Sequence, residues 1–233
     1  MTTEAEAKQH LVKKLEYDHC LETILALADD QAGVEWPTFL PLCNQLSQRG
    51  ISLCNGTIKF RINLETNTNR LFILPKILTI FGVNDPRYWK WIYITDHITS
   101  VDAPQLIAIQ KLDIRGAFSA PLVTPKVLNV LSLLVLLTEN TGGWQTPLNV
   151  TITTPDGSTR QSQVSLARKP IGIFFELTVG EFTLNDDGCN STGLVKFSVT
   201  EYSNYEKRGM LIKGCIVRAK FSLGCTNPTL DRA

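Results

Sequence analysis

A turn that leads directly into an aromatic strand is encoded in the octet NDPRYWKW, residues 84–91. Asn, Asp and Pro favour turns, and two of the chain's four tryptophans, Trp89 and Trp91, follow them. Side chains alternate between the faces of a strand, so these tryptophans would share one face, and Tyr88 and Lys90 the other. Because Trp is highly buried on average, the pattern favours a core role for one or both indoles. The alternative is an exposed aromatic plate that stacks on a planar or ring-shaped ligand.

Short strands bounded by turn residues are predicted on both sides of this octet. Upstream, residues 58–64 alternate between apolar and polar side chains, and residues 71–74 follow after a polar turn. Downstream, the predicted strands are 91–94, 106–118, 127–137, 145–153, 171–177, 193–200 and 210–221. Gly116 indicates a bulge or a close approach of neighbouring atoms. Many short strands separated by Gly, Pro, Asn and Asp turns predict a mainly β protein, an antiparallel β-sandwich rather than a parallel α/β sheet.

The first fifty residues have a helical period instead. Apolar residues recur at helical spacing over 17–28 and again over 39–46, after Pro37. Two amphipathic helices of this size are marginal alone, so they must pack on the remaining domain, on each other or on a second chain. We therefore divide the chain into a short α-helical N-terminal extension, 1–50, and a β-sandwich domain, 51–233.

Composition limits the classes of ligand. The formal net charge of +1 predicts no long-range attraction to nucleic acid or to an anionic membrane, and fits an uncharged ligand best. The longest apolar run, 127–137, is too short to cross a bilayer as a helix, so we expect no membrane insertion. The N-terminus lacks the pattern of a signal peptide, so we expect a cytosolic protein with reduced cysteines. The six cysteines contain no CxxC pair, and we predict neither a metal nor a cofactor.

No motif in the sequence predicts catalysis. His10, His19 and His97 lie near no known catalytic motif. Glu176 and Glu181 could be mistaken for a glycosidase pair, but residues five apart on a regular strand face opposite ways. A shared site would require a bulge at the neighbouring glycine, residue 180. We therefore expect a binding protein and not an enzyme.

Four blocks, in the right order, resemble the phloem protein 2 lectins, the plant family that includes the tobacco agglutinin-type lectins. The blocks are 78–91, which contains the octet, 112–116, 174–182 and 207–220, and the resemblance spans about residues 55–221. It implies a jelly-roll-like β-sandwich that binds oligomers of N-acetylglucosamine in the phloem. It also implicates motif tryptophans and acidic residues, which in this chain are Trp89, Trp91, Glu176 and Glu181.

A sugar site needs an aromatic plate, because a pyranose has an apolar C–H face, and a few hydrogen-bonding groups for its hydroxyls. The candidate carbohydrate-binding residues are Trp89, Trp91, Tyr88, Asn84, Lys90, Phe81, Glu176 and Glu181. Phe81 stands where the family commonly has another Trp, and a Phe-Phe pair, residues 174–175, replaces the usual lead into the acidic block. Such losses of an indole donor or plate would weaken the site or shift it to longer oligosaccharides.

The resemblance implies two further functions. Phloem protein 2 members form homodimers and disulfide-linked filaments with a partner phloem protein, and the candidate cross-linking thiols are Cys20, Cys43, Cys54 and Cys225. Cys215, inside an apolar strand, is predicted to be buried. Members also bind RNA, for which the basic residues of 207–220, beside Tyr202 and Tyr205, are the candidates. A solvated edge strand explains the same residues, so RNA binding is secondary.

Overall fold

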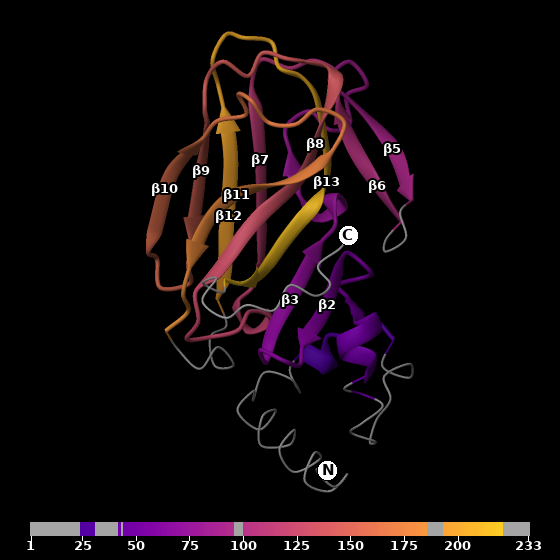
Figure 1. The fold of residues 1–233 in the computed structure, drawn as a ribbon, viewed down its shortest axis with the longest axis vertical. Coiled ribbons are helices and arrows are strands. Elements are labelled where there is room, and N and C mark those ends of the chain that lie inside the picture. Colours follow the sequence, from indigo (N-terminus) through magenta and orange to yellow (C-terminus); the bar gives the residue numbers. More distant parts are fainter. Residues whose placement is uncertain (1–23, 31–41, 43, 96–99, 186–192, 221–233) are drawn as a thin grey trace, which may run out of the picture.

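Two antiparallel sheets pack face to face in the computed structural model, which describes residues 24–30, 42, 44–95, 100–185 and 193–220 (Figure 1). The expectation of a mainly β sandwich is confirmed. In the described part of the chain, short helical turns accompany the strands, among them η1 (Gln45–Arg49), η2 (Pro75–Ile77) and η3 (Ala120–Leu122). The core lies between the sheets, where the inward side chains of both layers meet.

The larger sheet has eight strands and is centred on β13. Its members are β1 (Ile51–Leu53), β2 (Ile58–Asn63), β3 (Thr68–Ile73), β5 (Trp89–Thr95), β6 (Ser100–Leu106), β8 (Asn129–Gly142), β11 (Phe174–Phe182) and β13 (Arg208–Ala219). Strand β13 pairs with β8 along one edge and with β3 and β6 along the other. Among the described strands β5 pairs with β6 alone, and this hairpin stands to one side of the sandwich (Figure 1).

The smaller sheet has five strands in the order β10-β9-β12-β7-β4. They are β4 (Thr79–Ile80), β7 (Leu112–Ser119), β9 (Leu148–Thr153), β10 (Thr159–Val164) and β12 (Leu194–Glu201). Gly116 of β7 is paired with Phe197 of β12, and a Cβ built on Gly116 would lie 2.4 Å from the Phe197 ring. The close approach predicted at this glycine is therefore confirmed, and it lets the Phe197 ring enter the core.

A bulge in β11 sets the positions of two candidate carboxylates. The register to β8 shifts between Thr178 and Gly180, so Glu176 lies opposite Leu134 and Glu181 opposite Val130. The two glutamates therefore share the outer face of the larger sheet, which a regular strand would not allow. Four residues of β8 separate them, roughly 13 Å at strand rise.

Most predicted strands overlap an observed one, and the exceptions have identifiable causes. The predicted strand 106–118 corresponds to β7, which begins at Leu112, and β6 was not predicted apart from its last residue, Leu106. Strand β10 was not predicted because its residues are polar and almost all exposed, so they show no alternation.

The described part of the N-terminal extension packs on the β-sandwich. Ile24, Leu25 and Leu46 are buried in the same core as the strands, and Ala28 forms a β-bridge with Leu53. The hydrophobic stripes predicted in this region therefore have a partner in the domain itself. Residues 24–26, 42 and 44 are helical and fall within the two predicted helices. The other parts of the extension before residue 44 lie outside the described residues, except for residues 27–30.

Candidate functional site

Trp89 lies at the base of β5 and belongs to the core. Its side chain is 2% exposed, and its indole N–H donates to the backbone oxygen of Phe81 over 3.0 Å. Its backbone N–H donates to the carbonyl of Asp85, 3.0 Å away. Trp89 therefore holds the preceding turn against the core and has no ring face left for a ligand. This corrects the assignment of Trp89 to the sugar site.

The turn before β5 is braced by its own side chains. Asp85 accepts hydrogen bonds from the Arg87 guanidinium at 2.6–3.1 Å, which lower the pKa of Asp85 to about 2. The same guanidinium lies 5.3 Å from the ring centroid of Tyr88, which is half-buried. A Cβ on Gly82 would lie 2.9 Å from this ring, so the turn requires glycine there. Asn84 is exposed at the tip, beside an open hollow of about 670 Å³.

Beyond Trp89 the same face of β5 is open to solvent. Trp91 and Tyr93 lie opposite Pro104 and Asp102 of β6, and they are 40% and 68% exposed. Side chains two apart on a strand are separated by roughly 7 Å, so the two rings are neighbours. Asp102 forms an ion pair with Lys76 of η2 at 2.6 Å. We call Trp91 and Tyr93 the hairpin platform; Lys90, on the other face of β5, is exposed and lies apart from it.

A second aromatic group, the upper cluster, lies on the outer face of the smaller sheet and consists of Phe81, Lys111, Asp113, Arg115 and Tyr202. The exposed ring of Phe81 follows β4, and its backbone N–H donates to the carbonyl of Asp113 at 2.9 Å. The Lys111 ammonium lies 5.4 Å from the Phe81 ring centroid and 5.1 Å from that of Tyr202. One face of each ring is therefore occupied by a cation.

Hydrogen bonds fix the charges of the upper cluster. Arg115 donates to both carboxylate oxygens of Asp113 at 2.8 and 3.0 Å, and the Tyr202 hydroxyl donates to Oδ2 at 2.6 Å. The hydrogen bond from Arg115 is the main cause of a lowered pKa of Asp113, and the bond from Tyr202 lowers this pKa further. The bond to Asp113 in turn raises the pKa of Arg115. Sequence reasoning missed this group because its members come from three separate segments, with no local spacing to connect them. Only the register between neighbouring strands shows that these residues lie close together.

A groove of about 530 Å³ continues from the upper cluster along the outer face of the smaller sheet. We call it the sheet groove. Its polar lining comes from four neighbouring strands: Thr79, Arg115, Thr151, Thr153, Lys196 and Ser198. The register pairs Arg115 with both Thr79 and Ser198, and Ser198 with Thr151, so these side chains form one row across the sheet.

The two candidate glutamates lie on the opposite layer of the sandwich. Glu176 accepts two hydrogen bonds of 3.0 Å from Arg218, and Glu181 is paired with Lys220 at 2.5 Å. Their strand, β11, belongs to the larger sheet, whereas Phe81 lies on the outer face of the smaller sheet. The structure therefore does not bring Glu176 and Glu181 together with Phe81 as one site.

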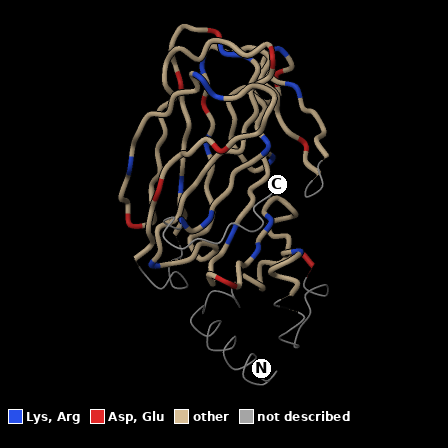
Figure 2. Tube along the Cα trace, in the orientation of Figure 1, with Lys and Arg blue, Asp and Glu red and all other residues tan. Residues whose placement is uncertain are grey.

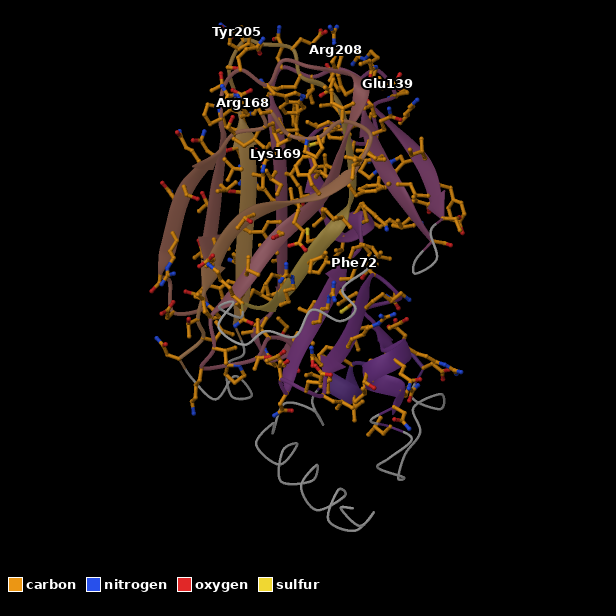
Figure 3. All side chains as sticks on the ribbon, in the orientation of Figure 1. Phe72, Glu139, Arg168, Lys169, Tyr205 and Arg208 are labelled. Atoms are coloured by element: carbon orange, nitrogen blue, oxygen red, sulfur yellow. The ribbon has the colours of Figure 1, made fainter. Side chains whose placement is uncertain are left out.

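Most cations of the basic 207–220 segment are already paired or buried. Lys207 is fully buried and paired with Glu201, and Lys213 is 7% exposed. Arg218 and Lys220 bind the glutamates of β11. Arg208 is exposed near the upper end of the molecule, where Tyr205 also lies (Figure 3). This segment therefore offers little positive charge to an RNA backbone.

The structure describes two of the cysteines. Cys54 is exposed, and partial burial, with the charge of Asp29, raises the pKa of its thiol. Cys215 is buried, as predicted, and burial raises its pKa strongly. The other candidate thiols, Cys20, Cys43 and Cys225, lie outside the described residues, as do all three histidines.

Two negative findings apply to the described residues. In that part of the chain no three His, Cys, Asp or Glu side chains gather as a metal site requires. Within the same ranges no helix is long and apolar enough to span a bilayer.

Solved structures with a related sandwich are distant from this chain. The CBM22-1 xylan-binding domain from Paenibacillus barcinonensis is 15% identical, aligns over 61% of this chain and 85% of that domain, and has a TM-score of 0.35. The Podospora anserina GH26-CBM35 β-(1,4)-mannanase is 12% identical over 69% of this chain and 30% of that enzyme, with a TM-score of 0.40. Likeness at this level carries no functional argument.

Sequence relatives are closer. A lectin of Luffa acutangula is 32% identical over 87% of this chain and 94% of its own, and a lectin of Coccinia grandis is 27% identical over 64% and 94%. Protein PHLOEM PROTEIN 2-LIKE A1 of Arabidopsis thaliana is 29% identical over 87% of this chain and 81% of its own. The family profile described as Phloem protein 2 matches residues 68–219. The chain therefore belongs to the phloem protein 2 family.

Proposed function

We propose that this protein is a lectin, a carbohydrate-binding protein and not an enzyme, whose ligands are oligomers of N-acetylglucosamine. Its family membership and the two relatives named as lectins support carbohydrate binding in general. The observation that carries the proposal is the hairpin platform, in which Trp91 and Tyr93 lie side by side and exposed on one strand face.

The platform suits a chain of sugar rings for a physical reason. An extended oligosaccharide presents apolar C–H faces along its length, and two aromatic rings in a row can each cover one of them. Asp102 and Lys76, across the hairpin from Tyr93, supply an acceptor and donors for hydroxyl and acetamido groups. Because the rings lie on an open edge strand, the site would accept internal segments of a longer oligomer.

The other exposed rings are less suited to this ligand. Lys111 covers one face of Phe81 and one face of Tyr202, so a sugar would have to displace a favourable cation–π contact. We therefore place Phe81 outside the proposed N-acetylglucosamine site, together with Trp89, Glu176 and Glu181. Asn84 and Tyr88 belong to the adjoining turn, which holds the base of the hairpin.

Calorimetric titration of the reduced protein with chitotriose tests this proposal. We expect saturable binding that changes little with salt, because the ligand is uncharged. Trp91→Ala and Tyr93→Ala should each weaken binding about tenfold or more. Tyr205→Ala, which removes a tyrosine of similar exposure at the upper end of the molecule, is the matched control and should bind normally. No heat from folded wild-type protein, or equal losses in the control, would contradict the proposal.

A cross-linking role in the phloem is the second candidate, favoured by the exposed thiol of Cys54. In it a homodimer, or a filament with a partner phloem protein, would form by disulfide exchange. The raised pKa of Cys54 works against it, because the thiolate is the reacting form. Oxidation followed by non-reducing electrophoresis should give disulfide-linked dimers that Cys54→Ser abolishes; unchanged dimers in this variant would exclude Cys54 as the linking residue.

A further inference from the structure

The sheet groove differs from the hairpin platform in both charge and lining. Hydroxyl groups of Thr79, Thr151, Thr153 and Ser198 lie among the side chains that line it. The one large ring at its floor, Phe197, turns into the core, where it is 4% exposed. The groove therefore offers hydrogen bonds to a polar ligand but no aromatic surface for stacking along its floor.

Cations are spread along this groove instead of converging on one point. Lys196 of β12 is exposed and forms no ion pair with any described residue. Arg115 of β7 is the diagonal neighbour of Lys196, since it pairs with Ser198 two residues further along β12. Diagonal neighbours on adjacent strands lie roughly 7–8 Å apart. Lys111 adds a third cation at the upper end, between Phe81 and Tyr202.

One carboxylate offsets only part of this charge. Of the described residues that line the groove, none is acidic. Asp113, at the upper end, forms an ion pair with Arg115 and accepts a hydrogen bond from Tyr202. The three cations Lys196, Arg115 and Lys111 therefore adjoin one carboxylate, which leaves a net positive charge. The opposite layer shows the contrast, because there Arg218 and Lys220 are each paired with a glutamate of β11. The positions of Lys and Arg along the chain are marked in Figure 2.

We propose that the sheet groove is a second carbohydrate site, which binds an acidic oligosaccharide with carboxylates repeated along its chain, such as an oligomer of a uronic acid. Separated cations match charges that recur along a polymer better than the compact charge of a single phosphate. The threonine and serine hydroxyls are suited to the sugar hydroxyls between the carboxylates. A single-stranded nucleic acid would instead require stacking rings along the groove.

Trigalacturonate, titrated into the full chain and followed by calorimetry, is the direct probe. We expect saturable binding that weakens as salt is raised, in contrast to chitotriose. Lys196→Gln and Arg115→Gln should each weaken it about tenfold, while chitotriose binding stays unchanged. Arg70→Gln, which removes an exposed arginine from the outer face of the other sheet, is the matched control. It should bind trigalacturonate like the wild type.

Two further measurements use wild-type protein, so they do not depend on the stability of any variant. The methyl ester of trigalacturonate has the same size without the charge, and we expect it not to bind. In wild-type protein, amide resonances of residues 151–153 and 196–198 should shift during the titration, and those of residues 91–93 should not. No binding of trigalacturonate, equal binding of its ester, stronger binding of a uridine oligonucleotide, or equal weakening by Arg70→Gln would each overturn the proposal. Because chitotriose is titrated in parallel, loss of the platform site and loss of the groove site are distinguishable.

Discussion

Trp89 and Trp91 lie two residues apart on one face of β5, yet their surroundings are opposite. Trp89 is 2% exposed and its indole N–H is bonded to the Phe81 carbonyl, whereas Trp91 is 40% exposed. The difference follows from what lies over each half of the strand. The base of β5 contributes to the core between the sheets, and its outer half belongs to a hairpin that stands to one side (Figure 1). Strand period thus determines which face a side chain shares, and the extent of the neighbouring layer determines whether that face is buried.

The largest expected effect is the loss of stability on truncating Trp89. Trp89→Ala should lower the free energy of unfolding by about 3–5 kcal/mol, because it leaves a cavity in the core. Trp91→Ala should lower it less, by about 1–2 kcal/mol, because this side chain is 40% exposed and its removal leaves no enclosed cavity. Urea unfolding of both variants measures the difference. Equal destabilisation by the two substitutions would remove the contrast between the two halves of the strand.

A smaller change at Trp89 separates its hydrogen bond from its volume. Trp89→Phe keeps an aromatic ring in the core but removes the N–H that donates to Phe81. We expect a loss of about 1–2 kcal/mol in the free energy of unfolding, with chitotriose affinity retained. If affinity for chitotriose fell tenfold in a folded Trp89→Phe variant, the buried indole would be part of the sugar site after all.

On the exposed half, the contribution of the ring can be separated from that of the hydroxyl. Tyr93→Phe keeps the stacking surface of the platform, so chitotriose affinity should fall by no more than about twofold. Calorimetry of this variant beside Tyr93→Ala measures the two contributions. A Tyr93→Phe variant as weak as Tyr93→Ala would mean that the hydroxyl, and not the apolar ring, carries the interaction.

The smallest expected effect is electrostatic and concerns the upper cluster. Hydrogen bonds, first from Arg115 and then from Tyr202, lower the pKa of Asp113. A carboxyl with a lowered folded-state pKa stabilises the fold above its unfolded pKa of about 3.9, and this contribution is lost as the pH falls through the folded value. Tyr202→Phe removes one of these bonds, so it should be less stable than the wild type near neutral pH, and the difference should shrink as acid protonates Asp113. A stability difference that does not change with pH would contradict this role for Asp113.

Much of the fold was predictable, because inward and outward residues alternate in most strands. The polar β10 gave no such signal, and β6 was missed apart from its last residue, Leu106. The sequence indicated that Glu176 and Glu181 could share a face only if the strand had a bulge at Gly180, but it did not show whether that bulge forms. The site was harder to predict, since Trp89 and Trp91 have the same local pattern. The upper cluster depends on register between distant strands, which local spacing does not contain.

The central claim is that chitotriose contacts Trp91 and not Trp89, and the two indole N–H groups report this directly. A ¹H–¹⁵N correlation spectrum of the wild-type protein, with indole peaks assigned by Trp→Phe substitution, would be followed while chitotriose is added. We predict that the Trp91 indole peak shifts saturably, while the Trp89 peak, hydrogen-bonded to the Phe81 carbonyl, stays in place. A saturable shift of the Trp89 peak with an unmoved Trp91 peak would contradict the account.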